Sequence, residues 1–166
     1  MKETPYLEGK QDMLAQLKTI PAFKPFEESK LMEMLALSKL RKYEPGETIM
    51  REGAYDCWMY FLLSGTVRVL KDGEEICQLK RYGDVFGEMS VVDGEARSAT
   101  VIAATIVMCL ALDGSIVDRV PPEEKPLFLA VLYRFISEVL AERLRHANEE
   151  LNKVKLELEQ LQQSNR

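Results

Sequence analysis

Two pairs of residues, Gly87-Glu88 and Arg97-Ser98, have the types and spacing needed to hold a small anionic ligand. The first pair stands at the start of a predicted helical turn, where backbone N–H groups attract an anion. The guanidinium of Arg97 can grip phosphate oxygens through its planar fork of donors. The carboxylate of Glu88 cannot donate a hydrogen bond, so in an anion site it can only accept one from a hydroxyl group of the ligand. Together they suit a cyclic nucleotide, with one charged ring phosphate and one free ribose hydroxyl.

The segment 86–101 resembles the phosphate-binding cassette of the cyclic nucleotide-binding domain, and we call it the cassette. The family pattern is Phe-Gly-Glu, an apolar–small–apolar turn, a variable loop, and Arg-(Ser/Ala/Thr)-Ala-(Thr/Ser)-Val. The matching residues are Phe86, Gly87, Glu88, Met89, Ser90, Val91, Arg97, Ser98, Ala99, Thr100 and Val101. Turn glycines extend the resemblance over roughly residues 20–145, and this order makes it specific. The family includes bacterial catabolite activators (CRP/FNR-like regulators), regulatory subunits of cAMP-dependent kinase and cyclic-nucleotide-gated channels.

The resemblance implies a role for each cassette residue. Glu88 accepts from the ribose 2′-hydroxyl, Arg97 pairs with the phosphate, and Val69 and Cys77 wall the base. The phosphate is also lined by backbone amides and by the Ser98 hydroxyl. The implied ligand-binding set in this domain is Val69, Cys77, Phe86, Gly87, Glu88, Met89, Ser90, Arg97, Ser98 and Ala99. Taken singly, Arg97 is also consistent with a surface arginine, and Glu88 with a carboxylate at a helix N-terminus.

A period of two in the hydrophobic pattern predicts a run of short strands in the middle of the chain. The strand candidates are residues 40–44, 47–51, 57–63, 66–71, 74–80, 97–103 and 105–112. Asp72-Gly73 is a strong hairpin signal between two of them. Short strands separated by glycine turns indicate an antiparallel sandwich or barrel. We therefore predict an α+β, mainly β fold, an antiparallel β-roll (double-stranded β-helix, jelly-roll-like), in agreement with the family.

Helical patterns flank the strands. Residues 9–19 and 25–39 have helical spacing, Asp113 can cap a short helix through Val120, and a long helix is expected from about Glu123 to Gln163. The predicted domains are accordingly 1–121, the binding roll with its N-terminal helices, and 122–166, a long C-terminal dimerisation helix.

The long helix carries an apolar seam that steps alternately by four and three residues. The seam consists of Leu144, Leu151 and Leu158 at heptad position a, and Leu140, Ala147, Val154 and Leu161 at position d. Sustained over three heptads, it predicts a coiled coil. Glu150 and Lys155 would pair across a parallel homodimer. The alternative is a single helix lying on its own domain.

The base contact is less closely defined than the phosphate contact. In the bacterial activators that this chain resembles, the long helix reaches the purine through a Thr followed by a Ser. Alignment on Arg143-Leu144 places Ala147 and Asn148 there. Asn148 offers both a donor and an acceptor and is a candidate for base contact, or else a solvated position e. Ser98, where Thr would indicate cGMP, favours cAMP over cGMP.

The composition argues against nucleic-acid and membrane partners. The chain of 166 residues has a net charge of −5 and no dense Lys/Arg cluster, so we predict no direct binding to nucleic acid. The longest apolar run, Val101 to Leu112, is shorter than the about 20 residues that span a bilayer. The first residues lack a signal pattern, so we predict a cytoplasmic protein.

Metal binding and catalysis have no support in the sequence. Cys57, Cys77 and Cys109 show no disulfide or zinc spacing and are predicted to be buried small hydrophobes. His146 is the only histidine, too few for a metal centre. No nucleophile–base set is visible. We predict no metal, no cofactor and no enzymatic activity.

The function expected from the sequence is a dimeric sensor that binds a cyclic mononucleotide and signals through its C-terminal helix. The downstream partner is not identified by the sequence. One alternative is the ligand-sensing fragment of a CRP/FNR-family transcription regulator, since no helix-turn-helix domain follows the long helix before Arg166. A second alternative is a scaffolding or kinase-regulatory subunit, although no Arg-Arg-x-Ser-like inhibitory segment is present.

Overall fold

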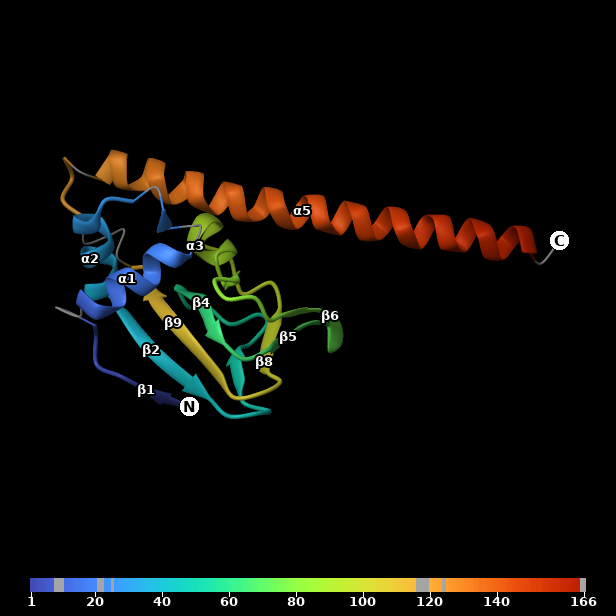
Figure 1. The fold of residues 1–166 in the computed structure, drawn as a ribbon, viewed down its shortest axis with the longest axis horizontal. Helices are drawn as coiled ribbons and strands as arrows, with labels where there is room; N and C mark the ends of the chain where they lie inside the picture. Colours follow the sequence, from blue (N-terminus) through green and yellow to red (C-terminus); the bar gives the residue numbers. More distant parts are fainter. Residues whose placement is uncertain (8–10, 21–22, 25, 116–119, 124, 165–166) are drawn as a thin grey trace. The chain divides into compact units, whose positions relative to one another are not determined.

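The computed structural model describes residues 1–7, 11–20, 23–24, 26–115, 120–123 and 125–164 (Figure 1). The chain divides into two compact units, Met1–Phe128 and Leu129–Arg166. The first unit contains the described strands and the helices α1 (Gln11–Thr19), α2 (Glu28–Ala36) and α3 (Met89–Asp93). The second is made by the long helix α5 (Lys125–Ser164), whose first residues belong to the first unit.

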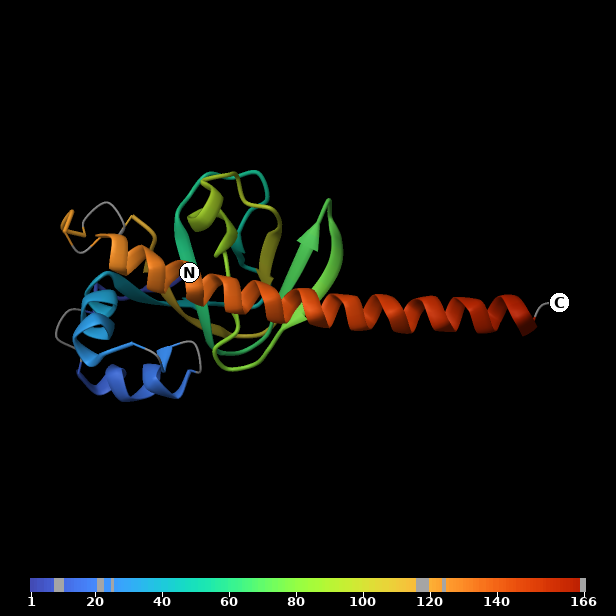
Figure 2. The same ribbon diagram turned by 90° about the horizontal axis from the view of Figure 1, so that it is seen from above.

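The described strands form two antiparallel sheets, which Figures 1 and 2 show from perpendicular directions. The first sheet has the order β1-β2-β9-β4-β7, with β1 Lys2–Glu3, β2 Ser38–Tyr43, β9 Val107–Asp113, β4 Trp58–Ser64 and β7 Val85–Phe86. The second has the order β3-β8-β5-β6, with β3 Thr48–Met50, β8 Thr100–Ala103, β5 Val67–Lys71 and β6 Glu74–Leu79. This architecture confirms the predicted antiparallel, mainly β fold with N-terminal helices and a long C-terminal helix.

Alternating side chains of the first sheet contribute to two apolar layers. One face joins the second sheet in a core that includes Tyr60, Leu62, Val67, Val101 and Cys109, all buried. Residues of the opposite parity, among them Phe61, Leu110 and Leu112, are buried on the other face. There the rings of Phe61 and Phe23 lie with centroids 4.6 Å apart. Successive side chains of this sheet therefore point to opposite faces, and both faces are covered by apolar side chains.

Each of the seven predicted strands overlaps an observed one, but the last part of the cassette differs. The strand predicted to begin at residue 97 begins at Thr100. The backbone of Arg97 instead bonds to the loop before β4: its N–H donates to the carbonyl of Ala54 at 2.9 Å, and its carbonyl accepts from Gly53 N–H at 2.9 Å. These bonds hold the arginine outside the sheet. Strands β1 and β7, of two residues each, were not predicted.

The helices confirm the predicted pattern, with changes at their ends. Helix α2 ends at Ala36 and not at residue 39, because Ser38 already pairs with Leu112 in the first sheet. The Ser38 hydroxyl donates to the carbonyl of Met34 at 2.7 Å. The short helix predicted from Asp113 to Val120 falls mostly on residues 116–119, outside the described residues. None of the described helices is long and apolar enough to cross a membrane.

The prediction that all three cysteines are buried is wrong for two of them. Cys109 is buried in the core, and burial raises the pKa of its thiol to about 12. Cys57 and Cys77 are exposed. Cys77 lies on β6, the last strand of the second sheet, and Cys57 precedes β4, so neither is enclosed between two sheets as Cys109 is.

Candidate functional site

Glycine at position 87 determines how the cassette leaves the first sheet. Strand β7 pairs with β4, and the chain then turns through Gly87 at φ +78° into α3. A Cβ at this position would stand 2.7 Å from the Trp58 carbonyl oxygen and 2.7 Å from Nη1 of Arg97. Only a residue without a side chain lets the backbone approach this closely while adopting a left-handed conformation. The turn therefore brings the backbone of Gly87 against the arginine.

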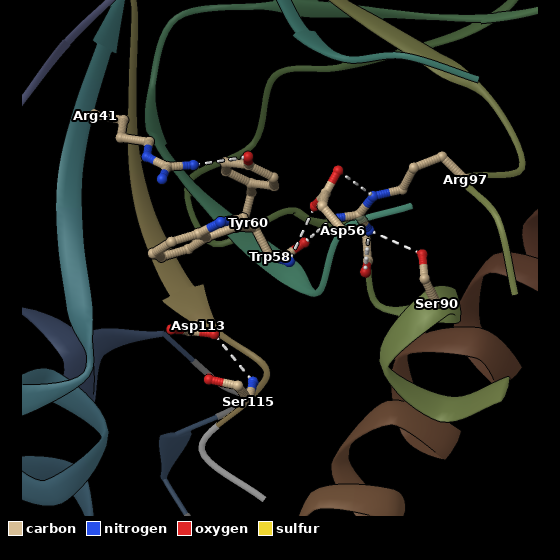
Figure 3. A network of polar contacts seen from close by, with 9 residues as sticks. Arg41, Asp56, Trp58, Tyr60, Ser90, Arg97, Asp113 and Ser115 are labelled. Carbon is tan, nitrogen blue, oxygen red and sulfur yellow. Dashed lines mark hydrogen bonds and ion pairs between the residues drawn. The ribbon is translucent and has the colours of Figure 1, made fainter. Parts of the chain in front are cut away.

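Arg97 is buried, with 2 % of its surface exposed, and it is held from three sides (Figure 3). Its Nη1 donates to the Gly87 carbonyl at 2.7 Å and to the Ser90 hydroxyl at 3.0 Å. Its Nε donates to Asp56 at 3.2 Å, and Nη2 donates to the same carboxylate and to the Trp58 carbonyl. The interpretation of Arg97 as an ordinary surface arginine is thus wrong.

All five N–H donors of the Arg97 guanidinium are engaged in these bonds. A phosphate could therefore bind only by taking the place of one or more acceptors. The carbonyls of Gly87 and Trp58 are fixed by the backbone, whereas the Asp56 side chain is 36 % exposed. The Asp56 carboxylate is also held by the Trp58 amide, at 3.1 Å. Among these acceptors, Asp56 is the one that carries a negative charge, so it competes most directly with an incoming anion for the guanidinium.

Sequence reasoning missed both Asp56 and Trp58. Asp56 is separated from Arg97 by 41 residues, and no motif in the loop before β4 links the two. A lone aspartate before a strand is ordinarily a turn residue, and Asp56 does accept from an amide two residues ahead. The pairing follows from the bonds between the backbone of Arg97 and residues 53–54, which only the folded chain contains.

The other predicted cassette residues differ in their accessibility. Glu88 is buried at the start of α3. Phe86 is also buried, and its ring stacks on that of Tyr60 with centroids 5.0 Å apart, so it belongs to the core. Met89 and Ser98 are exposed, and the Ser98 hydroxyl lies 3.6 Å from the Met89 sulfur. The structure thus combines a buried Arg97 and Glu88 with an exposed rim.

The remaining predicted site residues lie outside the cassette. Val69 and Cys77 are directly paired across β5 and β6, so their side chains share one face of the second sheet. Val69 also pairs with Val101 of β8, the strand that follows the cassette. Asn148 lies in the second compact unit, on α5, and is exposed. The first unit therefore brings together the cassette and the two apolar positions.

A second buried arginine, Arg41, is joined to the cassette arginine through Trp58 (Figure 3). The Arg41 guanidinium carbon lies 3.9 Å from the centroid of the Trp58 ring, and Nη1 donates to the Tyr60 hydroxyl at 2.9 Å. Its Nε donates to Glu3 of β1 at 3.0 Å. Burial raises the pKa of Tyr60. Trp58 thus stacks on one arginine with its ring and accepts from the other with its carbonyl.

The described groups are suited to binding an anion. Among the described residues, no group of three or more His, Cys, Asp or Glu side chains is arranged to hold a metal ion. A guanidinium, a buried carboxylate and nearby backbone amides can bind a phosphate and a hydroxyl without any attacking group.

Comparison with known proteins identifies the family of this domain. Residues 40–120 match the family model for the cyclic nucleotide-binding domain. Over 110 residues, the chain is 33 % identical to a cAMP-dependent protein kinase regulatory subunit of Colletotrichum orbiculare, covering 66 % of this chain and 27 % of that protein. Residues 40–120 therefore form a cyclic nucleotide-binding domain. The chain spans about a quarter of the length of this relative.

Solved structures show which kind of domain this is. The catabolite activator protein of Thermus thermophilus is 28 % identical, with a TM-score of 0.62, covering 81 % of this chain and 63 % of that one. A cyclic nucleotide-binding domain from Methylobacillus flagellatus KT has a TM-score of 0.74 at 19 % identity, covering 90 % of this chain and 86 % of that one. The domain is the β-roll of cyclic nucleotide-binding proteins, as the sequence predicted.

Proposed function

We propose that this chain is a regulatory sensor that binds a cyclic mononucleotide through the cassette. The observation that carries the proposal is the buried guanidinium of Arg97, which is held beside the glycine turn and is paired with a half-exposed carboxylate, that of Asp56. The phosphate replaces the Asp56 carboxylate on Arg97. The ribose 2′-hydroxyl donates to Glu88, and the backbone amides of the cassette complete the phosphate contacts.

The ligand acts by changing the partners of Arg97. A ligand shifts an equilibrium only through contacts that differ between the two states. Displacement of Asp56 releases the loop before β4 from the guanidinium, while Trp58 still contacts both arginines. Through Arg41 and Glu3, this contact continues to the N-terminal strand β1. The exchange of one acceptor on Arg97 therefore has a physical route to the first sheet.

The ligand that we favour is cAMP, with cGMP as the alternative. Ser98 stands where a threonine would indicate cGMP, and its exposed hydroxyl is open to the phosphate. Val69 and Cys77 provide an apolar face for the base. Asn148 of α5, which carries a donor and an acceptor, stays the candidate for base contact that the sequence predicts, with a solvated position e as the alternative.

A thermal-shift panel of cyclic mononucleotides tests the proposal, with calorimetry to confirm affinity. A ligand present at about 100 times its Kd stabilises the folded state by about 2.7 kcal/mol. For a chain of this size, we expect cAMP to raise the melting temperature by about 5 °C or more. Linear 5′-AMP serves as the control, because it carries the same base without the cyclic phosphate. The absence of any shift with cAMP, cGMP or another cyclic mononucleotide refutes the proposed function.

We further propose that α5 forms a parallel coiled-coil homodimer. The seam positions Leu144, Leu151, Val154, Leu158 and Leu161 are all more than half exposed in a single chain. A helix with such a repeating apolar stripe is stabilised by burying it against a second helix. Glu150 at g and Lys155 at the following e give the parallel pairing a favourable charge contact. The occupant of this stripe is a second copy of the chain.

Replacing Leu151 by glutamate is expected to convert the dimer into a monomer. The substitution places a charge at the centre of the seam, where it would be buried against its copy. Light scattering should then report one chain mass of 19.0 kDa instead of twice that value. Leu156→Glu is the matched control, because Leu156 lies off the seam at position f and is 59 % exposed, against 52 % for Leu151. An unmodified chain that is already monomeric contradicts this part of the proposal.

The proposal places the protein in the cytoplasm as a regulator without catalytic activity of its own. The signal passes through α5 to a downstream protein. Similarity to the kinase regulatory subunit favours a regulatory-subunit role, and similarity to the catabolite activator favours the sensing part of a transcription regulator. In either case we propose that this chain makes no direct contact with nucleic acid.

A further inference from the structure

Trp58, the first residue of β4, holds the cassette arginine through its own backbone. Its carbonyl oxygen accepts from Nη2 of Arg97, and its N–H donates to the Asp56 carboxylate at 3.1 Å. Strand β7 pairs with β4 further along, at Tyr60 and Phe61, so these two peptide groups of Trp58 bond to side chains and not to β7. The position of the Trp58 backbone therefore helps to determine where the guanidinium of Arg97 lies.

The ring of Trp58 is held by Arg41, a residue of β2 that lies two strands away in the first sheet (Figure 3). The guanidinium carbon of Arg41 is 3.9 Å from the centroid of this ring. Arg41 pairs with Cys109 of β9, and β9 separates β2 from β4. The Arg41 side chain therefore crosses β9 to reach Trp58, and the small side chains of Cys109 and Ala111 on this face leave room for it.

The Arg41 guanidinium is itself fixed in place. Arg41 is 8 % exposed, its Nε donates to Glu3 at 3.0 Å, and its Nη1 donates to the Tyr60 hydroxyl at 2.9 Å. A planar guanidinium stacks well on an indole ring, and such a cation–π contact is stronger when it is removed from water. The two hydrogen bonds thus orient the guanidinium, and the guanidinium orients the ring of Trp58.

We propose that Arg41 is a positioning residue for ligand binding, which holds the Trp58 ring and thereby fixes the carbonyl that accepts from Arg97. This inference rests on the proposed function, and it adds a residue that lies outside the cassette and does not touch the ligand. A binding group that is already held in its productive geometry loses less freedom when the ligand arrives. Arg41 therefore raises the affinity for the cyclic nucleotide through the preorganisation of Arg97.

Two substitutions remove the contact from its two sides. Arg41→Met removes the cation and keeps an unbranched side chain, and Trp58→Leu removes the ring and keeps the backbone carbonyl. We expect each substitution to lower the affinity for cAMP about tenfold, because Arg97 is then held less firmly before the ligand binds. Calorimetric titration with cAMP measures both changes.

The double variant, with both Arg41→Met and Trp58→Leu, separates a positioning role from an independent structural contribution. If Arg41 acts through the Trp58 ring, the second substitution should lower the affinity by less than about a further twofold. Two independent contributions would instead multiply to about 100-fold. That result would overturn the proposed role of Arg41.

The fluorescence of Trp58 reports on the ring directly, because the chain contains one tryptophan. In a folded Arg41→Met protein, the ring loses the guanidinium that covers it. We therefore expect the quenching constant for acrylamide to rise relative to that of the unmodified chain. An unchanged quenching constant would show that Arg41 does not hold the ring.

Lys39→Met is the matched control for Arg41→Met. Lys39 lies two residues before Arg41 on β2 and donates to the same carboxylate, that of Glu3, at 2.8 Å. Its ammonium is 4.8 Å from the centroid of an aromatic ring, but this ring is that of Tyr6 and not that of Trp58. Its replacement should leave both the affinity for cAMP and the quenching constant of Trp58 unchanged.

The outcomes distinguish this inference from the proposed function. If the unmodified chain binds cAMP, and folded Arg41→Met and Trp58→Leu proteins bind it equally well, the role of Arg41 is refuted while the proposed function stands. If the unmodified chain binds no cyclic nucleotide, the proposed function fails and this inference fails with it. A thermal melt of each variant separates loss of folding from loss of binding.

Discussion

Replacing Arg97 by leucine is expected to lower the affinity for a cyclic mononucleotide by at least about 30-fold. Truncation of one member of a buried charge pair costs roughly 2–5 kcal/mol of binding free energy, and about 1.4 kcal/mol corresponds to tenfold in affinity. Leucine fills part of the space but offers no donor to the phosphate. Calorimetric titration with cAMP measures the change.

The same substitution is expected to destabilise the folded chain. Arg97 satisfies the carbonyls of Gly87 and Trp58 and the carboxylate of Asp56. Loss of a buried hydrogen-bonded charge costs about 3–5 kcal/mol. Because the Asp56 side chain is 36 % exposed and can be solvated, we expect a smaller loss of about 2–3 kcal/mol in the free energy of unfolding. Denaturant unfolding with and without cAMP measures both effects in one series.

Arg68→Leu is the matched control for Arg97→Leu. Arg68 is an arginine of the same unit whose ion pair with Glu75 lies at the surface, and such pairs contribute at most about 1 kcal/mol. Its replacement should change neither the affinity nor the stability by more than that. An Arg97→Leu protein that remains folded and binds cAMP as the unmodified chain does would falsify the assignment of Arg97 as the phosphate ligand.

Replacing Gly87 by alanine is expected to have the second largest effect. The new Cβ would stand 2.7 Å from a backbone carbonyl oxygen of β4 and 2.7 Å from the Arg97 guanidinium, closer than real Cβ contacts allow. The left-handed φ of +78° adds about 1 kcal/mol of strain. With overpacking of 1–3 kcal/mol, we expect the free energy of unfolding to fall by about 2–4 kcal/mol. The cassette must also shift, so the affinity for cAMP should fall at least about tenfold.

The substitution Gly94→Ala separates the backbone strain of a left-handed residue from the steric overlap of the new Cβ. Gly94 also has a left-handed φ, +69°, but a Cβ there meets no atom within 4 Å. Its substitution should therefore cost only the strain of about 1 kcal/mol and leave the affinity nearly unchanged. If both variants lost equal stability and equal affinity, the close approach of Gly87 to Arg97 would not be required for folding or for cAMP binding.

The sequence by itself determined the class of fold and the location of the phosphate site. Short apolar runs between glycine turns specify the strands, and in β4 and β9 the runs are nearly continuous because both faces of the first sheet are covered. The cassette was recognisable because a glycine turn, a carboxylate and an arginine are close together in the sequence. Local chemistry of this kind leaves a local pattern.

Only the tertiary structure decided which groups bind Arg97 and which of them a ligand must displace. Its partner Asp56 is 41 residues away, and the contact forms because the backbone of Arg97 bonds to the loop before β4. A pattern of residue types cannot specify such contacts, because register and long-range pairing are set only when the strands come together. The sequence therefore predicted the arginine, and the fold determined its competing carboxylate.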